Sequence, residues 1–488
     1  MDETQPLLPD ADTDQLPKVH GANVIDFDPN GDAENPQEWP RAYKWGIVAL
    51  LASTAFTVTF TCIGIVPVAN RIVRDLNHGE SSKSSSVLLV TIWELGEAAG
   101  PLLIAPLSEL YGRYPVMNAA NVLFISATIL AALCQSTPLF IAARALTGLA
   151  VASNVLSPAI VGDMFISEQR GSAMSYIMLA PLLGGAVGPA IAGAVAQSLG
   201  WRQVLWMSAI LAGLCEVLFL FCSRETYKVA ILRRRAARLR EETGNKALRT
   251  AYDDENESGN RKFWDSIMRP VVVFGDSVVL QMLAIYGSLA FSYFYVMSTT
   301  LPDILEGVYH LSPALTGSSF ICFSIGSTVS LVIVNLLLDR IYIKLRDTHK
   351  GIEQPEHRLP LVIVGAFSMP FVIALYGWVP ALGLPLPLML ICLGFLGATM
   401  LLAFMPLMAY VVDAFKLYSA SALTALIVVR CLVGTFLPLI TEPLIKSLGY
   451  GWGFTVLCAA SLCVAPIPVL VFRYGARWRQ RSTYTKEE

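Results

Sequence analysis

Charged residues are scarce in this sequence. Of its 488 residues only 15% are Asp, Glu, Lys or Arg, whereas a soluble domain carries roughly 25%, and 55% are hydrophobic. Residue types that perform enzyme chemistry are also few, because the five histidines lie outside the long apolar runs and the nine cysteines form no Cys-x-x-Cys pair. We recognise no Ser/His/Asp arrangement, metal-ligand spacing or phosphate-binding loop. The sequence therefore predicts neither an enzyme nor a metal or cofactor site.

What the sequence has instead is a series of long apolar runs. A helix needs about 20 apolar residues to cross the hydrocarbon core of a bilayer, and twelve runs meet this length. The pattern predicts an all-α integral membrane protein with twelve transmembrane helices in two six-helix halves. The predicted spans cover residues 45–69, 86–108, 116–134, 138–162, 172–198, 202–222, 277–301, 314–338, 359–379, 384–408, 418–444 and 452–472.

Basic residues are distributed unevenly between the loops that join these runs. With the N-terminus in the cytoplasm, cytoplasmic segments hold 28 of the 35 Lys and Arg residues and the external loops hold five. The positive-inside rule then predicts that both termini are cytoplasmic. The N-terminus is acidic and polar, so we expect no cleavable signal peptide. We expect a multi-pass protein of the cell membrane or the vacuolar membrane.

Two polar stretches divide the chain. The first 44 residues are rich in Pro, Asp and Asn and lack apolar periodicity, which predicts a disordered tail. Between residues 224 and 269 twelve basic residues are offset by eight acidic ones, which argues against nucleic-acid binding. The predicted parts are a tail (1–44), a first half (45–222), a central cytoplasmic loop (223–275), a second half (276–472) and a C-terminal tail (473–488).

The fifth span contains a stretch of small residues from Gly184 to Gly193. A helix here carries one aliphatic ridge and is nearly bare elsewhere, so other helices can approach its backbone closely. We expect Gly184, Gly188, Pro189 and Gly193 to form a packing seam where the two halves meet. Pro189 is expected to bend this seam, because it removes a backbone hydrogen bond.

Several ionisable residues lie within the predicted spans. Glu94 and Glu97 occupy adjoining positions of the second span, and Arg144 stands alone in the fourth. Because Arg stays charged, Arg144 must either meet a carboxylate, backbone carbonyls or water at this depth, or snorkel to a helix end. A membrane-embedded carboxyl group can carry a proton. The candidates are Glu94, Glu97, Glu216 and Glu442, of which we favour Glu97, with Arg144 acting on it.

Charged residues also cluster at the predicted cytoplasmic ends of the helices. Glu109 precedes Arg113 by four residues, a spacing that lets the two side chains clamp helix ends together. Asp163 and Arg170 form a second acid–base cluster, and the second half repeats these features in outline. We expect the clusters to close the cytoplasmic face in one conformation. Their members are Glu109, Gly112, Arg113, Asp163, Arg170, Asp339, Arg340 and Asp413.

The seventh span is rich in aromatic and hydroxyl-bearing residues. Such side chains suit an amphipathic, partly planar ligand in a midplane cavity. The alternative is an aromatic belt at the external membrane interface, where Tyr is enriched. The predicted cavity residues are Gln281, Tyr286, Phe291 and Tyr293, followed in the sequence by Phe294 and Tyr295.

Three of these motifs resemble patterns of the major facilitator superfamily, and within it of the fungal twelve-span drug:proton antiporters. The stretch from Gly184 to Gly193 looks like the antiporter motif of the fifth span. Arg144 begins a sequence similar to the fourth-span motif R-x-x-Q-G, although Thr147 replaces the Gln. Residues 105–114 are similar to the loop motif G-x-L-x-D-R-x-G-R-R, from which they depart at four positions.

The resemblance, which runs from about Asn35 to the end of the twelfth span, implies proton-coupled export of a small organic compound by rocking of the two halves. It also implies that Arg144 takes part in proton coupling. The expected partners are the substrate, protons and the bilayer, with the chain acting as a monomer. Two alternatives stay open: a uniporter or proton symporter that imports a solute, and a receptor of the same fold. The substrate, a foreign toxicant or a self-made metabolite, is not specified.

Overall fold

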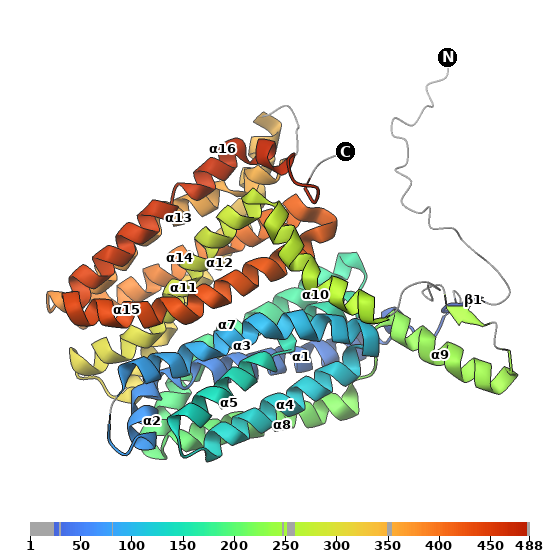
Figure 1. Cartoon of the computed structure of the whole chain (residues 1–488), viewed down its shortest axis with the longest axis horizontal. Coiled ribbons are helices and arrows are strands. Elements are labelled where there is room, and N and C mark those ends of the chain that lie inside the picture. Colours follow the sequence, from blue (N-terminus) through green and yellow to red (C-terminus); the bar gives the residue numbers. More distant parts are fainter. Residues whose placement is uncertain are drawn as a thin grey trace.

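Two bundles of long helices lie side by side in the computed structural model, which describes residues 24–28, 31–80, 82–245, 248–250, 259–348 and 354–485. In Figure 1 the blue-to-green helices of the first half form the lower bundle, and the yellow-to-red helices of the second half form the upper one. This arrangement confirms the predicted all-α fold in two halves.

The first half begins at Arg41, directly after the Trp39-Pro40 pair, and ends at Cys222. Two predicted spans are interrupted: the first breaks at Gly64 and the fourth at Ala150–Ala152. Its elements are α1 (Arg41–Ile63), η2 (Val66–Val68), α2 (Ala69–Leu76), α3 (Lys83–Tyr111), α4 (Arg113–Leu133), α5 (Thr137–Leu149), α6 (Ser153–Met164), α7 (Ser167–Ser198) and α8 (Trp201–Cys222).

The second half follows a short amphipathic helix, α10 (Gly259–Asp276), which contacts both α3 and the second half. The elements of the second half are α11 (Val278–Gly307), α12 (Pro313–Thr348), η3 (Pro355–Arg358), α13 (Pro360–Ala381), α14 (Leu386–Phe415), η4 (Lys416–Tyr418), α15 (Ser419–Val464) and α16 (Ile467–Arg479).

Eleven segments of the described chain are long and apolar enough to cross a membrane. The last of them, Ser419–Arg479, has 61 residues. At 1.5 Å per residue it is roughly three times as long as the about 30 Å core of a bilayer, so it is too long for one crossing. Gly449, at φ 76°, breaks the helix in its middle and turns the chain back. This segment holds the eleventh and twelfth spans, which gives the twelve predicted.

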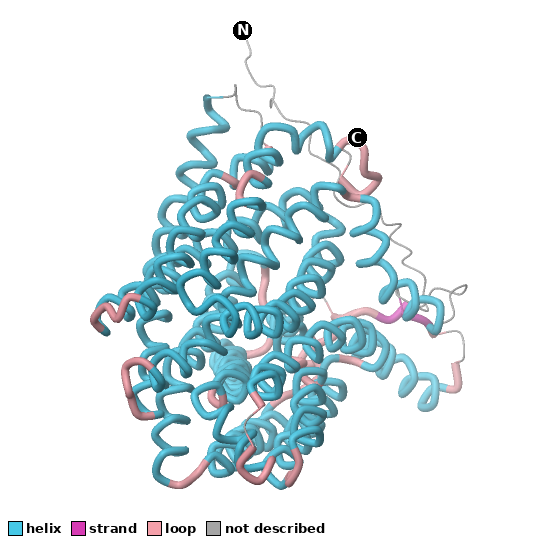
Figure 2. Tube along the Cα trace, turned by 60° about the vertical axis from the view of Figure 1, so that its left-hand side comes forward, coloured by secondary structure: helices cyan, strands magenta, loops and turns pink. Residues whose placement is uncertain are grey.

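The polar end segments are more ordered than the sequence predicts. Residues 24–28 and 31–44, assigned to a disordered tail, form strand β1 (Val24–Ile25), the short helix η1 (Pro36–Glu38) and the start of α1. β1 pairs in parallel with β2 (Arg249–Thr250), outside the helix bundle (Figure 2). Helix α9 (Lys228–Thr243), which precedes β2 in the sequence, carries arginines that form ion pairs with acidic residues of the tail. Arg235, for example, lies 2.5 Å from Asp32. Charge complementarity therefore orders a segment that lacks apolar periodicity.

The C-terminal segment is also held in place. Arg479 at the end of α16 forms a bidentate, buried ion pair with Glu356 of η3, at 2.8 and 3.1 Å. Ser482 donates a hydrogen bond of 2.7 Å to Asp276, and Thr483 donates two more to the same oxygen. The hydrogen bond from Ser482, with those from Thr483, lowers the pKa of Asp276 below its ordinary value.

Candidate functional site

The two halves meet at midplane in a cluster of ionisable side chains. Glu94 of α3 is fully buried, and the hydroxyl group of Tyr295 of α11 donates a 2.5 Å hydrogen bond to its Oε1 atom. The two residues belong to different halves. A buried carboxyl group without such a donor would carry a large desolvation cost, so the hydroxyl group stabilises Glu94 in this position.

Glu97, one turn along α3, forms an ion pair across the same interface. Nη2 of Arg430, in α15, lies 3.2 Å from its Oε1 atom, and each of the two side chains is only 13% exposed. Nδ2 of Asn154, in α6, donates a 2.9 Å hydrogen bond to the same oxygen. The guanidinium group of Arg430 also lies 4.3 Å from the ring centre of Phe291. Glu97 therefore connects three helices, and its charge is shared between the halves.

Antiparallel packing of α3 against α15 positions these groups. Thr435 donates a hydrogen bond to the carbonyl of Thr91, and Ser84 donates one of 2.8 Å to Glu442 nearer the predicted external end. Gly434 makes room for the cluster, because a Cβ atom there would lie 3.2 Å from Oε2 of Glu94. We call this contact of α3 with α11 and α15 the polar seam.

Arg144 is buried beside the polar seam but takes no carboxylate partner from it. Its guanidinium group donates to the carbonyls of Thr61 and Cys62, at 3.1 and 3.0 Å, and lies over the ring of Trp93 at 4.8 Å. Of the partners left open by the sequence, the structure selects carbonyls. These carbonyls are at the C-terminal end of α1, where a cation is favourable to the helix dipole. Arg144 thus stabilises the break in the first span, and Arg430 is the cation that contacts Glu97.

The small-residue stretch of α7 faces two different neighbours. A Cβ atom on Gly184 would lie 2.9 Å from the carbonyl of Phe56, and one on Gly188 would lie 3.4 Å from Phe60, so these two glycines pack on α1 within the first half. A Cβ atom on Gly193 would lie 2.4 Å from the carbonyl of Pro313 in α12.

The glycine that approaches α7 most closely comes from the second half. A Cβ atom on Gly317 of α12 would lie 2.0 Å from the carbonyl of Pro189. We call this contact of α7 with α12 the glycine seam. The predicted seam between halves is therefore present at Pro189 and Gly193, whereas Gly184 and Gly188 lie within one half, because the helix turns them toward α1.

At the predicted cytoplasmic end of the first half, Arg113 contacts Asp163 at 3.6 Å and donates a 2.5 Å hydrogen bond to Ser108. Glu109 is exposed, so the expected clamp between Glu109 and Arg113 is replaced by one between Arg113 and Asp163. The backbone amide of Arg113 donates to the carboxylate of Glu225, at 2.9 Å.

Gly112 allows this approach of Glu225 to the start of α4. Its φ of 101° is unfavourable for other residues, and a Cβ atom there would lie 2.1 Å from Oε2 of Glu225. Arg170, also predicted for this face, donates a 3.0 Å hydrogen bond to the carbonyl of Gly162 and thereby closes its own loop.

The second half has a corresponding cluster around a residue that the sequence did not indicate. Arg358 of η3 contacts Asp413 and also Asp339, the latter at 3.4 Å. Arg340 is exposed on α12 and lines a surface hollow with Lys344 and Asp347. Arg358 lies in a short loop without apolar periodicity, and the only signal for it is the outline repeat that places Asp413 opposite Asp163.

The predicted cavity residues of α11 do not come together. Gln281 donates hydrogen bonds to carbonyls at the end of α10, and Tyr293 donates one of 2.9 Å to the carbonyl of Leu457. Tyr286 is buried. Phe291 alone of the four contacts the midplane cluster, through Arg430. One helix presents side chains on all sides, so a stretch of aromatic residues cannot all face one cavity.

Of the other candidate proton carriers, Glu216 lies in α8 and accepts a 2.7 Å hydrogen bond from Asn121 of α4. Both helices belong to the first half, so Glu216 does not connect the halves. Glu442 lies near the predicted external end, as described above. Only Glu94 and Glu97 belong to the midplane cluster.

Comparison with known proteins gives a consistent result. The family model of the Major Facilitator Superfamily matches residues 48–438. The efflux pump radE of Floropilus chiversii is 34% identical over 494 residues, which cover 99% of this chain and 90% of that protein. The MFS transporter cpaT of Aspergillus oryzae is 32% identical and the MFS-type transporter penM of Penicillium rubens 33%; the alignments cover 94% and 95% of this chain and 92% and 90% of those proteins.

Solved structures share the fold at lower identity. A D-xylose–proton symporter superposes with a TM-score of 0.64 at 16% identity, over 88% of this chain and 97% of that one. A human organic anion transporter, MFSD10, superposes with a TM-score of 0.59 at 17% identity, over 88% of this chain and 100% of that one. At this identity the likeness concerns the arrangement of helices alone.

Proposed function

Because the chain belongs to the major facilitator superfamily of membrane transporters, we propose that it exports a small organic compound, a fungal secondary metabolite or toxicant, in exchange for protons. The family consists of transporters, not enzymes, and the relatives named above are an efflux pump and transporters of fungi. The efflux function named for radE supports export over import. The proton-coupled part rests on the polar seam.

The observation that carries the proposal is the ion pair between Glu97 and Arg430. It joins the halves at midplane, and both side chains are mostly shielded from solvent. Breaking such a pair by removing one charge costs about 3–5 kcal/mol. Binding of one proton to Glu97 removes that charge reversibly. The protonation state of Glu97 is thus able to set whether the halves hold together at this level.

This pair gives a cycle in which the substrate and the proton break the same ion pair in turn. With Glu97 ionised, Arg430 holds the halves together toward the predicted external end. Substrate that enters from the cytoplasm displaces Arg430 and the halves open outward. Glu97 then takes up a proton from the external medium, stays neutral while the halves close again, and releases the proton inward. One proton enters for each compound that leaves, by alternating access around the midplane.

Arg144 has a positioning role in this cycle, because its hydrogen bonds hold the end of α1 beside Trp93 and α3. The clusters around Arg113 and Arg358 join helix ends within each half and keep each half rigid while it rocks. We propose that the chain acts as a monomer. We place both termini in the cytoplasm, and the protein in the cell membrane or the vacuolar membrane.

The test is accumulation of candidate fungal metabolites in inverted vesicles, with and without an imposed proton gradient. In Glu97→Gln the gradient-dependent part of accumulation should fall more than about tenfold, because the proton site and the ion pair are both lost. Glu216→Gln is the matched control: it removes another intramembrane acid of the first half, and we expect it to keep the gradient dependence.

Three outcomes would contradict the proposal. Equal accumulation with and without the gradient in the native protein would indicate a uniporter. Accumulation driven by the opposite gradient would indicate import by proton symport. Absence of movement of any compound, with ligand binding retained, would indicate a receptor of the same fold.

A further inference from the structure

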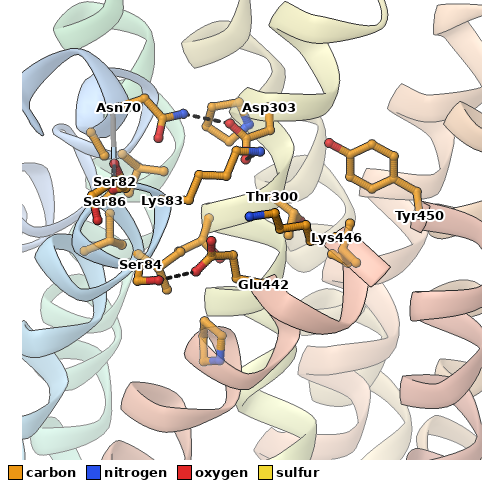
Figure 3. A pocket seen from close by; sticks show the side chains of 18 of the residues that line it. Asn70, Ser82, Lys83, Ser84, Ser86, Thr300, Asp303, Glu442, Lys446 and Tyr450 are labelled. Carbon is orange, nitrogen blue, oxygen red and sulfur yellow. Dashed lines mark hydrogen bonds and ion pairs between the residues drawn. The ribbon is translucent and has the colours of Figure 1, made fainter. Parts of the chain in front are cut away.

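A cavity of about 660 Å³ lies between the halves at the predicted external end of the polar seam (Figure 3). This volume falls in the range of small-molecule sites, about 300–1,000 Å³. Its floor is one helical turn from the midplane cluster, since Val90 precedes Glu94 by four residues and Thr299 follows Tyr295 by four. A compound that leaves the midplane toward the external side would pass through this cavity.

The two carboxylates of the cavity are already occupied by donors. Asp303 of α11 accepts a 2.7 Å hydrogen bond from Asn70 and lies 3.5 Å from the ammonium group of Lys83. Glu442 accepts a 2.8 Å hydrogen bond from Ser84. In each case the donor belongs to the first half and the acid to the second, so these contacts latch the external ends of the halves together.

One cation of the cavity is left without such a partner. Among the described residues, Lys446 of α15 forms neither a hydrogen bond nor an ion pair, and its side chain is exposed. Figure 3 shows Lys83 and Lys446 reaching into the cavity from opposite sides, with Tyr450 beyond Lys446. A negative group can therefore bind Lys446 without displacing any protein acid.

The remaining walls suit the apolar body of a ligand. Apolar side chains line the cavity from both halves, next to hydroxyl groups that can orient a polar substituent. The apolar lining residues are Val66, Val87, Val90, Pro302, Pro438 and Ile445. A site with apolar walls and one free ammonium group fits a small amphipathic acid, which buries its body and presents its charge to the lysine.

We propose that this cavity is a release-side binding site for small organic acids, with Lys446 as the residue that binds the acidic group. The proposal deepens the export function and rests on it. A bound anion also attracts Lys83, whose contact with Asp303 is long and 59% exposed on the lysine side. Loss of that contact weakens the latch, so binding of the acid at this site favours opening of the external end and release.

The experiment measures the charge preference of the cavity directly and needs no known substrate. Thr299, which lines the cavity and hydrogen-bonds only to its own helix, is replaced by Cys as a reporter. The purified protein reacts with three methanethiosulfonates: one with a sulfonate, one with a trimethylammonium group, and the neutral methyl reagent. Reaction of the nine native cysteines is subtracted with the unsubstituted chain.

Each rate is divided by the rate of the same reagent with a free thiol in solution, and the ratio refers to these normalised rates. On this scale we expect the sulfonate reagent to react faster with Thr299→Cys than the cationic reagent. Adding Lys446→Gln should lower this ratio about 25-fold, because one ammonium group a few Å away in a water-filled site changes the rate of each reagent about fivefold, in opposite directions. The matched control is Lys344→Gln, an exposed lysine at the opposite end of the molecule, which should leave the ratio unchanged.

Three results would overturn the inference: a preference for the cationic reagent, a ratio that Lys446→Gln leaves intact, or no reaction with the neutral reagent, which would mean a closed cavity. The vesicle assay separates this inference from the export function. If gradient-driven export holds but the ratio ignores Lys446, only the release-side site fails; if the ratio depends on Lys446 but no gradient drives export, only the antiport fails.

Discussion

The two seams that join the halves differ in the kind of residue that forms them. The glycine seam brings the backbones of α7 and α12 together, and Cβ atoms at Gly193 and Gly317 would lie 2.4 and 2.0 Å from carbonyls of the other helix. The polar seam places Glu97 against Arg430 and Glu94 against Tyr295. The first brings backbones into close contact through small residues. The second holds charges and a hydroxyl group in the membrane interior.

This difference in composition gives the two seams different roles in transport. Close contact of small residues stabilises helices in lipid through van der Waals attraction, which does not depend on pH or on a ligand. An ion pair in a low-dielectric setting depends strongly on the charge of each partner. We infer that the glycine seam keeps the halves associated throughout the cycle, and that the polar seam decides when they open.

The largest effect is expected at the glycine seam. Gly317→Ala should nearly abolish transport, because its Cβ atom would overlap the carbonyl of Pro189, and overpacking of this kind costs about 1–3 kcal/mol. Gly188→Ala is the control, since its Cβ atom would lie 3.4 Å from Phe60, close to ordinary contact. Vesicle transport and the amount of inserted protein are measured together.

If Gly317→Ala transports normally, the close approach of α7 and α12 is not needed for function. The larger change Gly188→Leu is expected to abolish transport while insertion is retained, here through displacement of α1 rather than of α12.

A smaller effect should distinguish the two buried arginines. Arg430→Gln should remove the dependence of transport on the proton gradient, since Glu97 loses its partner. Arg144→Gln should instead lower thermal stability by about 1–3 kcal/mol, because the carbonyls of Thr61 and Cys62 lose their donors, and should keep the gradient dependence of the remaining transport. The measurements are thermal unfolding in detergent and vesicle transport at two gradients.

The assignment of different roles to Arg144 and Arg430 would be wrong if Arg144→Gln abolished the response of transport to the proton gradient at unchanged thermal stability. Arg144 would then belong to proton coupling itself, as the resemblance of its motif implies, and not to the positioning of α1.

The smallest effect concerns the C-terminal residues Ser482 and Thr483, which donate hydrogen bonds to Asp276 of α10, a helix in contact with α3 and α15. Because the pKa of Asp276 is lowered by its hydrogen bonds, its charge stabilises the docked C-terminal segment above its ordinary pKa, and this contribution is lost as the pH falls through the lowered value. Hydrogen exchange of the Thr483 amide should therefore be slowed at neutral pH and lose that protection in acid.

Asp276→Asn should reduce this protection several-fold at neutral pH, with little difference from the native chain at low pH. Asp265→Asn, an exposed acid on the same helix, is the control. Protection that does not change between neutral and acidic pH in the native chain would contradict the assigned role of Asp276.

Much of the fold was predictable because the membrane imposes simple rules. Run length predicted twelve spans, and Gly449 turns the chain inside the predicted loop 445–451. The structure departs from the prediction where breaks divide the first, fourth and twelfth spans. Ordering of residues 24–28 was not predictable, because it depends on the contact of Asp26 with Lys228 of α9 and on pairing with β2.

The residues of the candidate site could be predicted from the sequence, but the contacts between them could not. Glu94 and Glu97 stand out because acids are rare in apolar runs, and both lie in the midplane cluster. Their partners Tyr295 and Arg430 come from the other half, more than two hundred residues away in each case. The same holds for Arg358, which contacts Asp339 and Asp413 from a loop with no pattern of its own.

The sequence alone determined how many times the chain crosses the membrane, how it divides into two halves and which rare charges lie at depth, because the cost of exposing polar groups to lipid acts on each segment independently. Only the tertiary structure decided which of those charges meet. Pairing depends on the rotation and height of each helix relative to its neighbours, and these are set by contacts such as Gly317 against Pro189 that no single segment contains.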